Sequence, residues 1–216
     1  MTIKNAIFDM DGTLIDSMLL WRSFQCDAVT KTTGIELSRE EREFLCQNNC
    51  GGILRNVSEK YRISIDTEEI VRLCTEDMKK KYLSGDIAVK PYVTEYFAKL
   101  KAEGGRIALA TATPKELCIP YLKLKGLYNC FDAVLTPKDD VPIDKDQSPA
   151  VYDAALAAIG GTKEDTAIFE DVIFAIKTAK NAGYYVIGVA DRQAVETRGE
   201  IIALADRYIE SYKELL

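Results

Sequence analysis

The chain contains no histidine among its 216 residues. Without an imidazole it cannot build a Ser-His-Asp or Cys-His triad, a histidine-ligated zinc or haem site, or a histidine general base. Chemistry at neutral pH must therefore come from carboxylates, lysine, cysteine or a bound metal ion.

An excess of positive charge is also missing. The 28 lysine and arginine residues are outnumbered by 34 aspartate and glutamate residues, which gives a net charge of -6. The longest basic run is 79–81, whereas nucleic-acid-binding domains usually carry a basic patch or stripe. We therefore expect no nucleic-acid partner.

Long apolar runs are absent as well. No stretch approaches the ~18 residues that a membrane-spanning helix needs, and Met1–Asn5 lacks the apolar region of a signal peptide. We expect a cytoplasmic protein with no membrane partner, whose six cysteines are reduced. Cys46 and Cys50 lie one helical turn apart, but no second pair or histidine completes a metal site.

Short apolar runs alternate with helical patterns over most of the chain. Strands are predicted over 3–10, 106–110, 132–135, 166–169 and 185–189, with a weak strand near 207–209. Helical patterns separate these strands from 93 onward. Such alternation predicts an α/β fold with a doubly wound, Rossmann-like parallel sheet that is covered on both faces.

The stretch from residue 16 to about residue 88 breaks this alternation. It shows apolar residues at helical spacing but no clear strand. Ser17 and Ser38 are suited to be helix N-caps, and Asp66 or Thr67 opens a further helix. The sequence therefore predicts an α/β core made of residues 1–15 and 91–216, with an inserted α-helical cap domain over 16–90.

Polar residues follow the predicted strands at the end where a parallel sheet gathers functional groups. They are Asp9 and Asp11 after the first strand, Thr111 after the second, and Glu170 and Asp171 after the fourth, with Lys145 in a nearby loop. Carboxylates bind a hard cation through oxygen, lysine neutralises phosphate charge, and an aspartate can attack phosphorus. Together these residue types indicate Mg²⁺-dependent phosphoryl transfer.

The segment 8–17, with the sequence FDMDGTLIDS, resembles the first motif of the haloacid dehalogenase (HAD) superfamily. Thr111, a lysine before a helix that begins at proline, and the sequence FED at 169–171 follow in the order of the family's other motifs, so the resemblance covers the whole chain. It is closest to the phosphatase and β-phosphoglucomutase-like branch, which carries a helical cap between the first two motifs.

The resemblance implies a role for each matched residue. Asp9 would be the nucleophile that becomes an aspartyl phosphate, and Asp11 would protonate the leaving oxygen and later deprotonate water. Mg²⁺ would be held by Asp9, the backbone carbonyl of Asp11, Glu170 and Asp171. The phosphate would be bound by Gly12, Thr13, Thr111 and Ala112, with its charge offset by Lys145.

The choice of lysine stays open. The related pattern places a lysine three residues before a proline, but Lys145 lies four residues before Pro149, and Asp146 occupies the strict position. One inserted residue would explain the difference, and Lys138 is the alternative.

Asp11 argues against a dehalogenase, because cleavage of a carbon–halogen bond needs no acid for a leaving oxygen. Related mutases carry a cap histidine twelve residues after the nucleophile, where this chain has Trp21. We therefore predict a Mg²⁺-dependent phosphatase for a small phosphorylated metabolite. A β-phosphoglucomutase-like mutase and a non-catalytic phosphoacceptor or binding protein are the alternatives, and the oligomeric state is left open.

Overall fold

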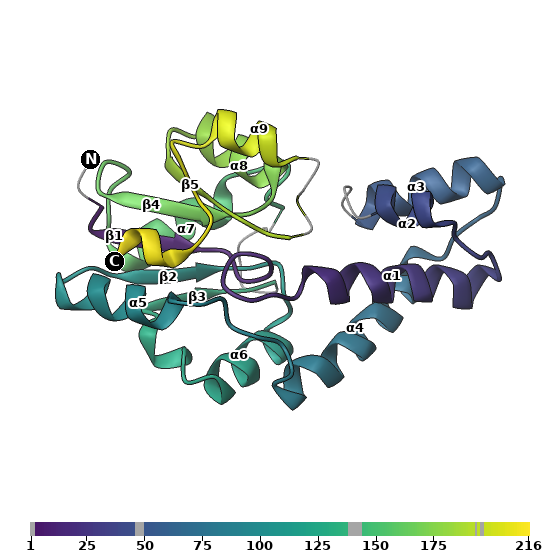
Figure 1. Cartoon of the computed structure of the whole chain (residues 1–216), viewed down its shortest axis with the longest axis horizontal. Coiled ribbons are helices and arrows are strands. Elements are labelled where there is room, and N and C mark those ends of the chain that lie inside the picture. The colour runs from purple at the N-terminus through teal and green to yellow at the C-terminus, as the bar shows by residue number, and fades with distance from the viewer. Residues whose placement is uncertain (1–2, 46–49, 138–143, 193, 195–196) are drawn as a thin grey trace.

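The computed structural model describes residues 3–45, 50–137, 144–192, 194 and 197–216. These residues form a six-stranded sheet whose neighbouring strands all run parallel, in the order β3-β2-β1-β4-β5-β6 (Figure 1). The strands are β1 (Asn5–Phe8), β2 (Ile107–Ala110), β3 (Ala133–Leu135), β4 (Thr166–Glu170), β5 (Tyr185–Val189) and β6 (Arg207–Ile209). The predicted doubly wound α/β fold is confirmed.

Helices cover both faces of the sheet (Figure 1). One face packs against α5 (Val93–Ala102), α6 (Lys115–Leu124) and the C-terminal 3-10 helix η2 (Tyr212–Leu215), and the other against α7 (Ala150–Ile159), α8 (Ile173–Asn181) and α9 (Arg198–Leu204). A short 3-10 helix, η1 (Tyr128–Cys130), precedes β3. Successive side chains of β1 face opposite layers, with Phe8 in one core cluster and Ile7 in the other, as the two-residue period of a strand requires.

The strand order reverses direction between β1 and β4. From β1 the chain adds β2 and β3 on one side, and from β4 it adds β5 and β6 on the other. In open parallel sheets, a crevice forms at this point outside the carboxyl ends of the strands. The residues that follow β1 and β4 are therefore the ones that the fold brings together at such a crevice.

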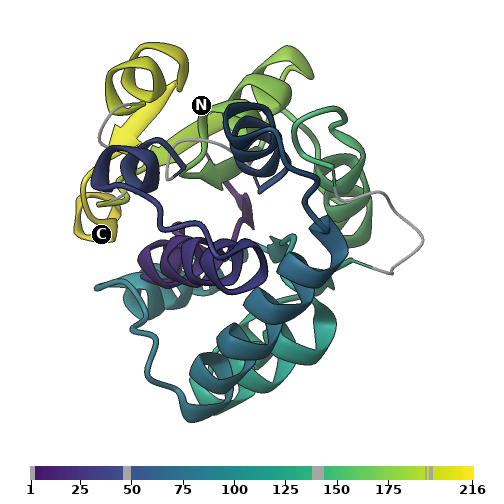
Figure 2. The same cartoon turned by 90° about the vertical axis from the view of Figure 1, so that its right-hand side faces the viewer.

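An insert of four helices follows the turn after β1. It comprises α1 (Met18–Thr33), α2 (Arg39–Leu45), α3 (Cys50–Tyr61) and α4 (Thr67–Ser84). The insert extends away from the sheet in Figure 1 and lies toward the viewer in Figure 2. Ser38 accepts a hydrogen bond from the Glu41 amide and Asp66 accepts one from the Glu69 amide, as expected of N-caps. Ser17 precedes α1, but its hydroxyl makes no cap and bonds to Asp11 instead.

Helix α4 links the insert to the main core. Its first half contributes Ile70 and Cys74 to a cluster within the insert, whereas Met78 and Tyr82 belong to the large cluster beneath the sheet. Helix α4 also packs against both α1 and α6. The end of the insert is thus continuous with the core of the α/β part.

The two chain segments that join the insert to the sheet lie side by side. The Asp16 amide donates to the Ala88 carbonyl (3.0 Å) and the Lys90 amide donates to the Leu14 carbonyl (2.8 Å). The ammonium of Lys90 also pairs with the carboxylate of Asp16 (3.0 Å). The insert therefore enters and leaves the α/β part through one paired connection.

Two further expectations concern membranes and thiols. Among the described residues, no helix combines the length and apolar character needed to cross a membrane. Cys118 and Cys130 are free thiols. Cys46, one member of the Cys46–Cys50 pair, lies outside the described residues.

Candidate active site

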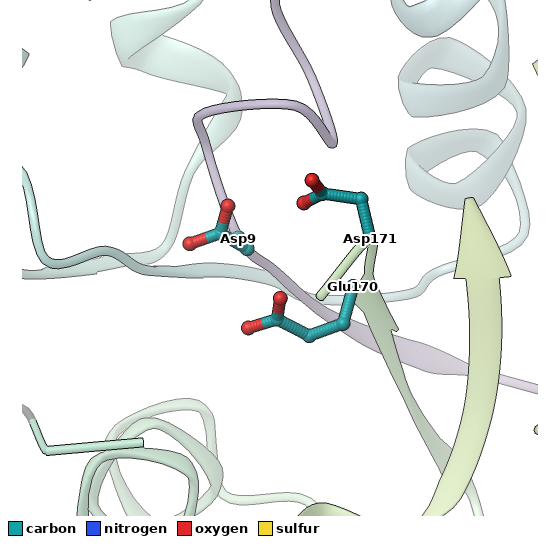
Figure 3. Close-up of side chains that lie close together, drawn as sticks. All are labelled: Asp9, Glu170 and Asp171. Atoms are coloured by element: carbon teal, nitrogen blue, oxygen red, sulfur yellow. The ribbon is translucent and has the colours of Figure 1, made fainter. Parts of the chain in front are cut away.

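Three buried carboxylates meet where β1 and β4 end. Phe8 and Phe169 are paired in register, and the Asp9 amide donates to the Phe169 carbonyl (3.0 Å). This pairing brings Asp9 next to Glu170 and Asp171. One carboxylate oxygen from each of the three residues lies within 4.8 Å of the others, and Figure 3 shows the three side chains converging.

This carboxylate cluster fits a hard divalent cation. Its three residues are nearly inaccessible to solvent, at 7%, 1% and 3% exposure for Asp9, Glu170 and Asp171. Oε2 of Glu170 is buried and has no hydrogen-bond partner among the described residues. A buried polar atom without a partner is costly, and oxygen-only ligand sets are those that Mg²⁺ and Ca²⁺ prefer. The donor set and the unpartnered oxygen thus suit a hard divalent cation of this kind.

Lys145 lies against the same cluster. Its Nζ is 2.5 Å from Oδ1 of Asp9 and 2.7 Å from Oε1 of Glu170. Burial by itself would lower the pKa of Lys145, but the two neighbouring carboxylates outweigh burial and hold this pKa above its usual value. Among the described residues, Lys145 is the lysine that bonds to these carboxylates; the alternative, Lys138, lies outside them.

Burial and mutual repulsion both act on the pKa values of the clustered carboxyl groups. Burial raises the pKa of Asp9, as do the carboxylates of Glu170 and Asp11, although Lys145 opposes them. Burial, followed by the charges of Asp9 and Glu170, also raises the pKa of Asp171 well above its ordinary range. One ammonium group therefore does not offset three carboxylates, and a bound cation would supply the missing positive charge.

The turn after β1 is built around Asp171. Gly12 has φ +84°, and a Cβ atom there would lie 2.1 Å from Oδ2 of Asp171. The hydroxyl of Thr13 donates to Oδ1 of Asp171 (2.8 Å), and the amide of Gly12 donates to the carbonyl of Ile15 (2.9 Å). Gly12 and Thr13, two of the four residues expected to bind phosphate, thus shape the turn and orient the carboxylate of Asp171.

The carboxylate of Asp11 is engaged elsewhere. Its Oδ1 accepts hydrogen bonds from the Ser17 hydroxyl, the Trp21 indole (3.1 Å) and the Tyr82 phenol, while Oδ2 accepts one from the Thr113 hydroxyl. Ser17, Trp21 and Tyr82 belong to the insert side, and Thr113 to the loop after β2. Asp11 therefore lies at the junction between the insert and the sheet.

Thr111 and Ala112 occupy the end of β2, beside β1. Thr111 is buried, and its Oγ1 accepts a hydrogen bond from the Thr113 amide (3.0 Å). Ala112 is exposed. These positions lie at the carboxyl edge of the sheet, as expected from the sequence.

Three tyrosine and threonine hydroxyls at the site were not anticipated from the sequence. Tyr82 and Thr113 bind Asp11, and Tyr152 of α7 donates to Oε1 of Glu170 (2.7 Å). In the sequence, Tyr82 and Tyr152 fit the apolar faces of their helices, which gives no signal for a hydroxyl that reaches a carboxylate. For Thr113, the sequence offered one local sign, namely its place two residues after Thr111 at the end of a predicted strand.

A family model described as haloacid dehalogenase-like hydrolase matches residues 6–189. The chain belongs to this family. It is thus an enzyme of the haloacid dehalogenase-like hydrolase family, as the resemblance of residues 8–17 implied.

Relatives within the family extend over most of the chain. Pyrophosphatase PpaX of Halalkalibacterium halodurans is 32% identical over 89% of this chain and 86% of its own length. The phosphorylated carbohydrates phosphatase of Thermotoga maritima is 28% identical over 84% of this chain and 82% of its own. The crystal structure of CbbY from Rhodobacter sphaeroides in complex with phosphate is 26% identical, with a TM-score of 0.75 over 99% of this chain and 96% of that one.

Proposed function

We propose that the chain is a Mg²⁺-dependent phosphatase that hydrolyses a small phosphomonoester through an aspartyl phosphate on Asp9. The observation that carries this proposal is the buried cluster of Asp9, Glu170 and Asp171, with Lys145 bonded to two of its members. A nucleophilic carboxylate beside cation ligands and a lysine is the combination that phosphoryl transfer needs. The names of the relatives support the same class of reaction.

Two positive charges would offset the negative charge of the phosphate and the nucleophile. Mg²⁺ held by Asp9, Glu170 and Asp171, with the backbone carbonyl of Asp11, would neutralise charge on the phosphate oxygens and on the nucleophile. Lys145 would add a second positive charge next to Asp9. We propose that Gly12, Thr13, Thr111 and Ala112 line the phosphate position, with Thr111 and the Ala112 amide donating to its oxygens.

The reaction would proceed in two half-reactions. A carboxylate oxygen of Asp9 attacks phosphorus, the bond from phosphorus to the ester oxygen breaks, and Asp11 gives that oxygen a proton. Water then attacks the phosphorus of the acyl phosphate, Asp11 takes a proton from the water, and the bond between Asp9 and phosphorus breaks. Inorganic phosphate and the original carboxylate are restored.

The insert is proposed to act as a cap domain over residues 16–90, on a core of 1–15 and 91–216. Trp21 of α1 and Tyr82 of α4 both bond to Asp11, which supports a location of the insert on the leaving-group side. A cover at that side would exclude bulk water from the acyl phosphate. We therefore expect the insert to choose among small phosphorylated metabolites.

The mutase alternative is disfavoured by Trp21. Its indole N–H donates to Asp11, and an indole nitrogen is a donor that cannot accept a proton. Trp21 therefore could not take a proton from a sugar hydroxyl, as a histidine at that position could.

The proposal is tested by hydrolysis of p-nitrophenyl phosphate with Mg²⁺ and with EDTA, in the wild type and in Asp9→Asn. Metal-dependent turnover that disappears in Asp9→Asn is the expected result. Full activity of Asp9→Asn would refute the assignment of the nucleophile, and labelling by acetyl phosphate without turnover would favour a non-catalytic phosphoacceptor. A panel of sugar phosphates, nucleotides and pyrophosphate, with glucose 1-phosphate isomerisation included, would then identify the substrate.

A further inference from the structure

The carboxylate of Glu170 is bound through only one of its two oxygens. Oε1 accepts hydrogen bonds from Lys145 Nζ and from the Tyr152 hydroxyl, both at 2.7 Å. Oε2 is buried and has no partner among the described residues. The two oxygens of this carboxylate are chemically equivalent, yet one accepts two hydrogen bonds and the other accepts none from the described residues.

Lys145 alone does not explain this difference. The terminal torsion of a glutamate is broad and nearly two-fold, so either oxygen could turn toward a single donor. The ammonium of Lys145 has three donors on a flexible stem and is shared with Asp9. It could follow the carboxylate through such a rotation.

Tyr152 has the rigidity that Lys145 lacks. Its side chain is fully buried in α7, which packs against β1, β2 and β3. The ring contacts the Lys145 ammonium on one side (5.6 Å to the centroid) and the Tyr184 ring on another (6.2 Å between centroids, edge to face). A tyrosine has only two side-chain torsions, so a packed ring fixes the location of its hydroxyl.

We propose that Tyr152 is a positioning residue that occupies Oε1 of Glu170 and thereby reserves Oε2 for the metal ion. The inference rests on the Mg²⁺ site of the proposed function. Tyr152 itself would touch neither the metal nor the substrate. Removing a group that orients a metal ligand typically weakens metal affinity by about 10–100-fold. Because Tyr152 supplies one neutral hydrogen-bond donor, we expect its loss to lie near the tenfold end of that range.

The experiment is a titration of the full-length, metal-free protein with Mn²⁺, with free Mn²⁺ measured by electron paramagnetic resonance. Tyr152→Phe should weaken binding about tenfold. Tyr184→Phe is the matched control, because its hydroxyl donates to Asp153 (2.6 Å) rather than to the cluster. An unchanged dissociation constant in Tyr152→Phe, or an equal loss in Tyr184→Phe, would overturn the proposal.

A double-mutant cycle separates positioning from general damage to the fold. If Tyr152 acts through Glu170, then adding Tyr152→Phe to Glu170→Gln should leave Mn²⁺ affinity unchanged from Glu170→Gln alone. A further tenfold loss in that background would contradict the inference. In turnover assays, the Mg²⁺ concentration for half activation should rise in Tyr152→Phe while kcat at saturating Mg²⁺ stays within about threefold of wild type.

The same titration distinguishes the two proposals. A wild type that binds no Mn²⁺ would count against the metal site and hence against the proposed function. A wild type that binds Mn²⁺ and hydrolyses p-nitrophenyl phosphate, beside a Tyr152→Phe variant of equal affinity, would count against the role of Tyr152 alone.

Discussion

The phenol of Tyr82 in α4 donates a hydrogen bond to Oδ1 of Asp11, which lies 71 residues earlier in the chain. The Tyr82 ring is fully buried and packs edge to face on Tyr121 of α6, with 5.4 Å between centroids. The hydroxyl of Tyr121 bonds instead to the Ile87 carbonyl (2.9 Å). The insert is thus fastened to the residue proposed as the general acid and base.

Replacing Tyr82 by Phe should therefore affect turnover according to the leaving group. p-Nitrophenolate departs without a proton, whereas an alkyl alkoxide needs one, and general acid catalysis is worth about 10²–10⁴-fold. We expect kcat/KM, which reports the transfer of phosphate to Asp9, to fall about tenfold for an alkyl phosphate in Tyr82→Phe and less than threefold for p-nitrophenyl phosphate. Tyr121→Phe should change the two rates equally, and an equal loss in Tyr82→Phe would contradict the role given to Tyr82.

The sheet could be predicted because its signal is local. The strands β1 and β4 are buried on both faces, so each appears in the sequence as a short continuous apolar run. Their polar successors, Asp9, Glu170 and Asp171, then follow from the rule that parallel strands end at one edge. Local pattern and tertiary structure agree at these positions.

The parts that sequence reasoning missed depend on contacts between distant residues. Ser17 resembles an N-cap, but bonding to Asp11 overrides that local preference. The phenols of Tyr82 and Tyr152 follow helical apolar spacing, and only the packed fold shows that each hydroxyl reaches a carboxylate.

Lys145 provides a test of an ambiguity that the sequence left open. Lys145→Met keeps an unbranched side chain, one atom shorter, but removes the charge beside Asp9 and Glu170. Loss of one preorganised charge at a reacting phosphate should lower kcat/KM about 100-fold or more. If Lys138→Met caused that loss and Lys145→Met did not, the lysine would have been assigned wrongly.

Asp171→Asn should stabilise the metal-free protein at alkaline pH. The pKa of Asp171 is raised by burial and then by Asp9 and Glu170, so the folded chain favours the neutral acid. Its contribution to stability is complete below the unfolded pKa of about 4 and is lost as the pH rises through the higher folded pKa. Urea unfolding in EDTA should show little difference between variant and wild type at pH 4, and a difference that widens to pH 8.

The stabilisation that Mg²⁺ gives to each protein tests the same carboxylate as a cation ligand. Adding Mg²⁺ at pH 8 should stabilise the wild type, because a ligand that binds only the folded state adds its binding free energy. It should stabilise Asp171→Asn less, because a neutral amide oxygen replaces a charged carboxylate ligand. A difference that stays constant with pH would contradict the raised pKa of Asp171, and an equal response to Mg²⁺ would contradict its role as a cation ligand.

Gly12→Ala should disturb the cluster by steric contact rather than by charge. Gly104 is the matched control, because it has a similar φ (+78° against +84°) but open space where a Cβ would lie, whereas at Gly12 the Cβ would meet Oδ2 of Asp171 at 2.1 Å. Gly104→Ala should cost about 1–2 kcal/mol, the price of a left-handed alanine. Gly12→Ala should cost more and should also weaken Mn²⁺ binding, because Asp171 must move. Equal unfolding midpoints, with Mn²⁺ affinity unchanged in Gly12→Ala, would mean that the turn yields without displacing Asp171.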